Sequence, residues 1–147
     1  MYKNLLVATD GSRLSDRAVA HALALARAVG ATVTAFYAAP DYPMPAYADG
    51  IVYEPVSRKE YTKLAAQDAE KILGKVAAKA KAAGVDCKSA FEIAATPWEA
   101  ILAAARKSKA DVIVMASHGR RGLSAVLLGS ETQKVLTHSK LPVLVVR

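Results

Sequence analysis

The sequence is poor in cysteine and has no long apolar run. Its 147 residues contain a single cysteine, Cys87, so an internal disulfide framework is excluded and the composition fits a reducing compartment. No apolar run approaches the roughly 18 residues that cross a membrane. The apolar stretch that follows Met1 is too short for a signal peptide. These absences predict a cytoplasmic protein that has no membrane partner.

The sequence also lacks any recognisable nucleic-acid-binding motif and the basic and aromatic interleaving of single-strand binders. It does carry a formal net charge of +7, to which Lys71, Lys75 and Lys79 contribute at four-residue spacing. Such a stripe is typical of a solvated helix face. We therefore do not expect nucleic acid as a partner, and we expect the charge to aid solubility and favour anionic ligands.

What the sequence does show is a regular alternation of short apolar runs with helical patterns. We expect strands at residues 5–8, 31–39, 85–94, 111–116 and 141–146, and helices at 14–29, 57–83, 96–107 and 130–138. Thr96, Pro97 and Glu99 predict a capping box at the start of the third helix. The alternation predicts one α/β domain over residues 1–147, a doubly wound parallel sheet with helices on both faces.

Residues 40–57 interrupt this alternation with four prolines and three tyrosines. Connections of this length are usually lids, binding loops or disordered segments. This one leaves the carboxyl end of the second strand, which is the edge where open α/β sheets bind ligands. We expect a lid over that edge, with an inert surface loop as the alternative.

Two turns have residues suited to a ligand site. The first is "ATDGS" (8–12), after the first strand, and the second is "ASHGRRG" (116–122), after the fourth. If these strands are neighbours, the turns face each other across a crevice. Asp10 then offers a carboxylate to a ribose hydroxyl or a metal ion, and Gly119 lets backbone N–H groups approach phosphate oxygens.

Gly129 and Ser130 add a second device, because they precede the last expected helix. The first N–H groups of a helix lack partners within it and lie at its positive end, so they bind anions. The spacing is neither the dinucleotide fingerprint nor the P-loop, which needs a lysine. Each piece alone has a plainer explanation: a strand-to-helix turn, a hydrogen-bonded loop histidine (His118), an exposed basic pair (Arg120 and Arg121) or a helix cap.

Together these residues resemble a single-domain universal stress protein over nearly the whole chain. Nucleotide-binding members of that family carry the pattern G-x-x-G-x9-G-[ST] after the fourth strand. Here Gly119 matches the second glycine, residues 120–128 supply the nine-residue spacer, and Gly129 and Ser130 complete it. Ala116 replaces the first glycine. The stretches "TPWEAIL" and "LPVLVV" are also similar to the family, and the resemblance implies an open five-stranded sheet of order 3-2-1-4-5.

The resemblance also implies a ligand, ATP or another adenine nucleotide, with Mg²⁺ held through the nucleotide near Asp10. It implies a homodimer formed by the strand Leu141 to Val146. By matching position, adenine and ribose would be bordered by Ala8, Thr9, Asp10, the Ala38 backbone, Met115 and Ala116. His118 and Arg120 lie within the motif, and the phosphates would be bound by Gly119, Gly129, Ser130 and the N–H of Glu131.

The function that follows is a cytoplasmic stress-response protein that binds nucleotide as a sensor or switch. Two alternatives stay open. One is a dimeric interaction protein that binds no nucleotide, since Ala116 is expected to weaken binding. The other is a slow ATPase or nucleotidyl transferase. Because the motif has no P-loop lysine and His118 is its only plausible acid or base, we assign no catalytic residue and expect at most slow ATP hydrolysis.

Overall fold

Five parallel strands form one sheet in the order β5-β2-β1-β6-β7. The computed structural model of the chain describes residues 1–43, 46–53, 56–120 and 127–147. The strands of this sheet are β1 (Asn4–Ala8), β2 (Thr32–Pro40), β5 (Cys87–Ala94), β6 (Val112–Ala116) and β7 (Val143–Val146). Counted along the chain these are its first to fifth strands, so the predicted order 3-2-1-4-5 is confirmed, and β7 is an edge strand.

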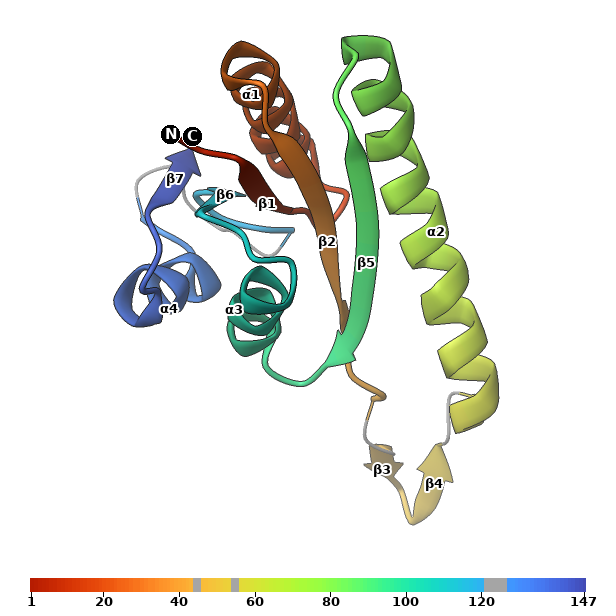
Figure 1. Cartoon of the computed structure of the whole chain (residues 1–147). Coiled ribbons are helices and arrows are strands. Elements are labelled where there is room, and N and C mark those ends of the chain that lie inside the picture. The colour runs from red at the N-terminus through yellow and green to blue at the C-terminus, as the bar shows by residue number, and fades with distance from the viewer. Residues whose placement is uncertain (44–45, 54–55, 121–126) are drawn as a thin grey trace.

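In the described part of the chain, helices cover both faces of the sheet (Figure 1). They are α1 (Arg13–Val29), α2 (Arg58–Ala83), α3 (Pro97–Lys107) and α4 (Ser130–His138). Because successive strand side chains point to opposite faces, Leu5 and Val7 of β1 pack in the core with α1 and α2. Leu6, between them in sequence, packs in a second core with α3 and α4. The doubly wound architecture is confirmed.

Short polar residues and glycines set the boundaries of α1 and α2. The Ser12 hydroxyl accepts the Ser15 N–H at 3.2 Å at the start of α1, and Ser57 caps α2 in the same way through Glu60. Gly30 and Gly84 end these two helices in the left-handed conformation, each with φ 69°, which glycine adopts without steric cost.

The capping box predicted for α3 is wrong. Thr96 is the N-cap residue, but with φ −123° and ψ 87° its side chain makes no capping hydrogen bond. The Glu131 carboxylate of α4 accepts the Trp98 N–H instead, at 2.8 Å. The first turn of α3 is therefore satisfied by a neighbouring helix and not by its own sequence.

Residues 40–57 contain a β-hairpin that the sequence reading missed. Strands β3 (Ala46–Ala48) and β4 (Ile51–Tyr53) pair in antiparallel fashion and project beyond the ends of β2 and β5 (Figure 1). Asp49 and Gly50 join them with φ of 51° and 76°, the backbone of the two-residue turns that Asp-Gly favours. Residues 44–45 and 54–55 lie outside the described ranges, and the lid stays a prediction.

Aromatic side chains hold the base of this hairpin against α2. The Tyr42 and Tyr61 rings meet edge to face, with their centroids 5.4 Å apart. The Tyr61 hydroxyl donates to the Asp41 carbonyl at 3.0 Å, and the Tyr42 hydroxyl donates to the Val56 carbonyl. The Arg58 guanidinium lies 5.0 Å from the centre of the Tyr42 ring. The hairpin is thus joined to the start of α2 on both of its sides.

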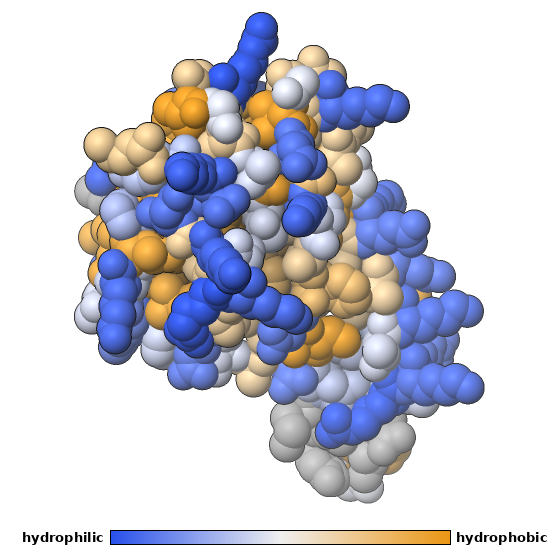
Figure 2. Space-filling model, in the orientation of Figure 1, coloured by the Kyte–Doolittle hydropathy of each residue, from blue (hydrophilic) through white to orange (hydrophobic). Residues whose placement is uncertain are grey.

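The lysine stripe lies on the exposed face of α2, as predicted. Lys71, Lys75 and Lys79 are all exposed, and Figure 2 shows hydrophilic side chains along the side of the molecule that α2 occupies in Figure 1. Among the described helices, none has an apolar stretch long enough to cross a membrane.

Candidate functional site

The two turns chosen from the sequence lie side by side at the carboxyl ends of β1 and β6. These strands pair in parallel from Leu5 opposite Val112 to Val7 opposite Val114, so the chain leaves both at the same edge of the sheet. The Asp10 carboxylate in the first turn accepts the Arg120 N–H in the second at 2.8 Å. The predicted juxtaposition of the turns is confirmed.

Asp10 joins these turns through both of its carboxylate oxygens. One accepts the Ser12 N–H at 2.9 Å and the other accepts the Arg120 N–H. Burial alone would raise the pKa of the Asp10 carboxyl, but hydrogen bonds from Ser12, Arg120 and Ser15 outweigh it and hold the pKa below its ordinary value of 3.8. The carboxylate is therefore ionised at neutral pH and stabilises both turns.

Gly119 makes this contact possible. A Cβ on Gly119 would lie only 2.7 Å from the Asp10 Oδ2 atom, closer than atoms pack without repulsion. Within the described chain, the space that Gly119 leaves is taken by a carboxylate of the protein itself. Any larger residue there would push Asp10 away from the Arg120 N–H.

Gly129 serves a similar purpose at the start of α4. A Cβ on Gly129 would lie 3.0 Å from the His118 Cα and 3.4 Å from the Ser117 carbonyl oxygen. The Gly129 N–H donates to that carbonyl at 2.8 Å. Gly129 thus seats the first turn of α4 directly against Ser117 and His118, and its own N–H already has an acceptor.

The first turn of α4 presents backbone donors at this edge. Ser130, Glu131 and Thr132 are its first three residues, and their N–H groups have no acceptor among the described residues, as expected for a helix start. The buried Thr132 hydroxyl donates to the Ala116 carbonyl at 3.0 Å. With the Glu131 carboxylate bonded to α3, two hydrogen bonds fix this turn in place.

The other predicted residues surround the ends of the strands. Thr9 is buried, and its hydroxyl lies 3.1 Å from the Ser15 hydroxyl and accepts the Gly11 N–H. Ala8 and Ala38 are half-buried on the α3 side of the sheet, where Met115 is buried. Ala116 points to the opposite face, into the core with α1 and α2.

His118 and Arg120 follow β6 in the second turn, and Arg121 lies outside the described residues. The Ser117 hydroxyl lies 3.2 Å from His118 Nδ1. The Arg120 guanidinium reaches over Gly11, since a Cβ on Gly11 would lie 3.0 Å from its Nη2 atom and 2.9 Å from Ile72 of α2. Arg120 therefore reaches from the second turn to the first.

Tyr37 and Asp68 near this edge were missed by the sequence reading. The Tyr37 hydroxyl donates to Asp68 of α2 at 3.2 Å. Burial and the neighbouring Asp68 carboxylate raise the pKa of Tyr37 to about 12, which keeps the phenol protonated. In sequence Tyr37 is only one more aromatic of a buried strand, and no local signal pairs it with Asp68.

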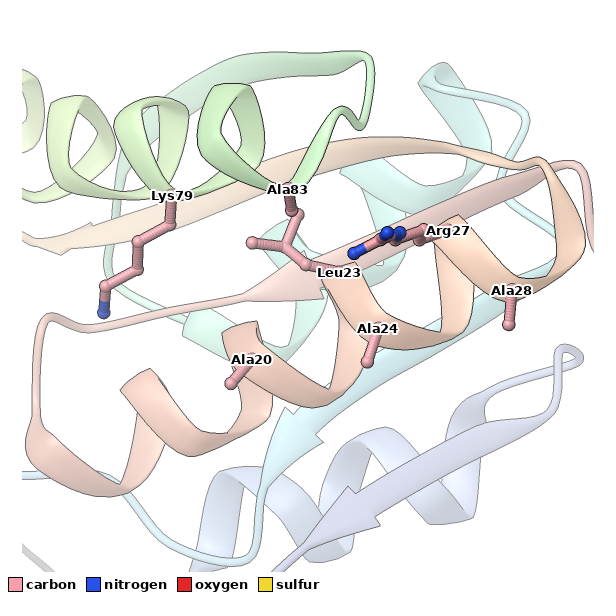
Figure 3. Close-up of a pocket in the computed structure, with 7 residues that line it drawn as sticks. All are labelled: Ala20, Leu23, Ala24, Arg27, Ala28, Lys79 and Ala83. Atoms are coloured by element: carbon pink, nitrogen blue, oxygen red, sulfur yellow. The ribbon is translucent and has the colours of Figure 1, made fainter.

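Two hollows on the described surface differ in their relation to this edge. A groove of about 620 Å³ lies between α1 and α2, with Ala24, Ala28 and Ala83 among its lining residues (Figure 3). It borders the ends of both helices that lie far from the turns. A second hollow of about 500 Å³ is lined by Arg13, Leu14, Arg17 and His118, and it adjoins the second turn. No three His, Cys, Asp or Glu side chains of the described residues gather to hold a metal ion.

These features define a doubly wound α/β domain whose two central strands end side by side, at the edge where such folds bind ligands. The chain belongs to the universal stress protein family, whose family model matches residues 1–147. It is 37% identical over 147 residues to the universal stress protein in the QAH/OAS sulfhydrylase 3′ region of Thermus aquaticus, covering 100% of both chains.

Solved structures agree with this assignment. The structure of hypothetical protein MJ0577 superposes with a TM-score of 0.80 at 24% identity, covering 99% of this chain and 96% of that one. A universal stress protein crystallised in complex with cAMP superposes with a TM-score of 0.71 at 30% identity, covering 99% of this chain and 97% of that one. The likeness to MJ0577 concerns the fold alone. The second relative was crystallised with an adenine nucleotide, cAMP.

Proposed function

We propose that this protein binds an adenine nucleotide, ATP among them, where β1 and β6 end, and acts as a cytoplasmic stress-response sensor or switch. The observation that carries the proposal is the first turn of α4, whose N–H donors are fixed in place by Gly129, Glu131 and Thr132. The cAMP complex of the relative at 30% identity supports an adenine nucleotide as the ligand.

In this proposal each side of the crevice binds a different part of the nucleotide. The N–H groups of Ser130 and Glu131 and the Ser130 hydroxyl bind phosphate at the positive end of α4. Asp10 borders the ribose, and the backbone of Ala38 borders the adenine. Nucleotide-bound Mg²⁺ is typically held by one or two carboxylates together with phosphates, and Asp10 suits that role because it is ionised.

The substitution of glycine by Ala116 is compatible with binding. The Ala116 side chain is 7% exposed and packs in the core formed with α1 and α2, so its methyl group points into the protein. Its carbonyl oxygen accepts the Thr132 hydroxyl. The added methyl group therefore fills core space and does not narrow the crevice.

Nucleotide binding is tested most simply on the unmodified protein. Protein purified from cells is denatured and the released small molecules are separated by chromatography. Calorimetry then measures the affinities of ATP, cAMP and GTP. We expect adenine nucleotide in the released fraction and measurable binding of ATP. Absence of both would contradict the proposal and favour an interaction protein that binds no nucleotide.

A pair of glycine variants tests where the nucleotide binds. Gly129→Val forces the His118 backbone away from α4, and we expect it to weaken ATP binding by about a hundredfold or more, equivalent to at least ~2.7 kcal/mol. Gly74→Val is the matched control, because a Cβ at Gly74 of α2 meets nothing within 4 Å. Circular dichroism confirms that both variants fold. Equal ATP affinity in the two folded variants would place the nucleotide elsewhere.

We also propose that the protein forms a homodimer through β7. This strand is at the edge of the sheet, and edge strands present unpaired backbone groups to other chains. Leu144 of β7 is 40% exposed, which leaves an apolar side chain at that edge. Light scattering should show a dimer that Leu144→Lys converts to a monomer, while Leu64→Lys on α2 does not. A monomeric parent protein would refute this assembly.

A further inference from the structure

The hollow at the start of α1 is lined by basic side chains that the nucleotide proposal does not use. Arg13 and Arg17 lie one helical turn apart and are both exposed. Residues four apart on a helix are neighbours on its surface. His118 of the second turn completes the basic lining, and Leu14 contributes an apolar side chain, in a hollow of about 500 Å³.

The described acids near this hollow have other partners. Asp16, in the same turn of α1, forms an ion pair with Lys79 of α2 at 3.1 Å. Asp10 bonds the N–H groups of Ser12 and Arg120. In the part of the chain that the structure describes, no carboxylate lies within ion-pair distance of Arg13 or Arg17. Two arginines without an acidic partner beside a hollow favour an anionic ligand.

The hollow and the first turn of α4 have His118 as a common neighbour. A Cβ on Gly129 would lie 3.0 Å from the His118 Cα, so the His118 backbone touches the residue before α4, while the same residue lines the hollow. The Ser117 hydroxyl, 3.2 Å from His118 Nδ1, holds the imidazole ring. His118 therefore lies between the start of α4 and the two arginines that line the hollow.

We propose that this hollow binds the outer phosphates of the nucleotide, so that the protein selects nucleoside diphosphates and triphosphates over monophosphates. The inference rests on the proposed nucleotide site. Guanidinium groups suit this ligand because each can donate two parallel hydrogen bonds to phosphate oxygens. The N–H groups of α4 bind the phosphate that every adenine nucleotide carries, whereas Arg13 and Arg17 bind those that AMP lacks.

The experiment compares ATP, ADP and AMP by calorimetry at one salt concentration. The test variant is Arg13→Ala/Arg17→Ala. The matched control is Lys71→Ala/Lys75→Ala, which removes two exposed charges at the same spacing from α2. We expect the parent protein to bind ATP at least tenfold more tightly than AMP. The arginine variant should lose that preference through weaker ATP binding, with AMP affinity unchanged, and the lysine variant should match the parent.

Two results would overturn the inference: ATP affinity that is unchanged in the arginine variant, or ATP and AMP affinities that fall by the same factor. If the parent binds no adenine nucleotide, the proposed function fails, and inorganic tripolyphosphate then tests the hollow separately. Tripolyphosphate that binds the parent and the lysine variant but not the arginine variant would support an anion site. Absence of binding to the parent would refute it.

Discussion

The turn after β1 and the first turn of α4 lie at the same edge of the sheet but use their polar groups differently. In the turn after β1, the polar side chains have hydrogen-bond partners within the protein. The Asp10 carboxylate accepts the Ser12 and Arg120 N–H groups. The hydroxyls of Thr9 and Ser12 accept the N–H groups of Gly11 and Ser15. At the first turn of α4, by contrast, no described residue accepts the N–H groups of Ser130 and Glu131.

This difference predicts that the turn after β1 stabilises the fold, whereas the first turn of α4 is free to bind a ligand. The turn after β1 contributes mainly to the free energy of folding, because its carboxylate holds the two loops together. The first turn of α4 contributes little to folding through its N–H groups, which water satisfies when no ligand is bound. Substitutions in the turn after β1 should therefore reduce stability, and those at the start of α4 should reduce affinity.

The largest effect on stability is expected for Asp10→Ala. This change removes the acceptor of the Ser12 and Arg120 N–H groups, and hydrogen bonds to charged groups are worth roughly 1.5–3 kcal/mol when buried. Because Asp10 is only partly buried, we expect a loss of about 2 kcal/mol in the free energy of unfolding, measured with urea. Asp86→Ala, at an exposed position before β5, is the control and should change it little.

The pH dependence of this effect follows from the lowered pKa of the Asp10 carboxyl. A carboxyl whose pKa is lower in the folded than in the unfolded protein stabilises the fold above its unfolded pKa. That stabilisation is lost as the pH falls through the folded pKa. The stability difference between the parent and Asp10→Asn should therefore be full at pH 7 and shrink below about pH 4, where the unfolded carboxyl titrates. A difference that stays constant down to pH 2.5 would contradict this account.

Thr132→Val tests the attachment of the first turn of α4 to the sheet. It replaces the buried hydroxyl that donates to the Ala116 carbonyl, at a cost of about 1 kcal/mol in stability. We expect ATP affinity to fall by a few fold, because the start of α4 loses one of its anchors. Thr137→Val removes a comparable bond to Gln133 on the exposed side of α4 and should leave ATP affinity unchanged. Equal effects of the two variants would show that this anchor is unimportant.

The smallest effect on stability is expected for Tyr37→Phe, which removes the hydroxyl that donates to Asp68. The pKa of Tyr37 is raised to about 12, so its stabilisation is complete below about pH 10, where an unfolded tyrosine titrates, and is lost as the pH rises toward 12. At neutral pH the variant should lose under about 1 kcal/mol. Below pH 11, Tyr37→Phe and the parent protein should show the same tyrosinate absorbance at 295 nm. If the variant instead lost one sixth of that absorbance, for one of six tyrosines, Tyr37 would titrate normally.

Local sequence patterns predicted the elements of the five-stranded sheet and the helices that cover it. The apolar runs mark the main strands, and the helical patterns between them mark the helices. The 3-2-1-4-5 order came from the family resemblance, because alternation alone leaves strand order open. The β3–β4 hairpin was missed although Asp49-Gly50 is a recognised turn signal, since the surrounding prolines suggested a loop.

The site was predicted in its position but not in its internal bonds. The two turns could be located from Asp10, Gly119 and Gly129. The contact of Glu131 with Trp98, 33 residues away in sequence, could not, since it depends on how α3 and α4 pack. Gly119 was expected to make room for a phosphate, whereas in the structure it makes room for Asp10. That contact also joins residues far apart in the sequence.

The central claim, that the N–H groups at the start of α4 bind nucleotide phosphate, is tested most directly by Ser130→Pro beside Ser130→Ala. Proline is well tolerated at the first position of a helix, so this variant removes one N–H and the hydroxyl and leaves α4 intact. Calorimetry should show ATP affinity falling by a few fold in Ser130→Ala and by a further tenfold or more in Ser130→Pro, with both proteins as stable as the parent. ATP affinity in Ser130→Pro equal to that of Ser130→Ala would contradict the claim.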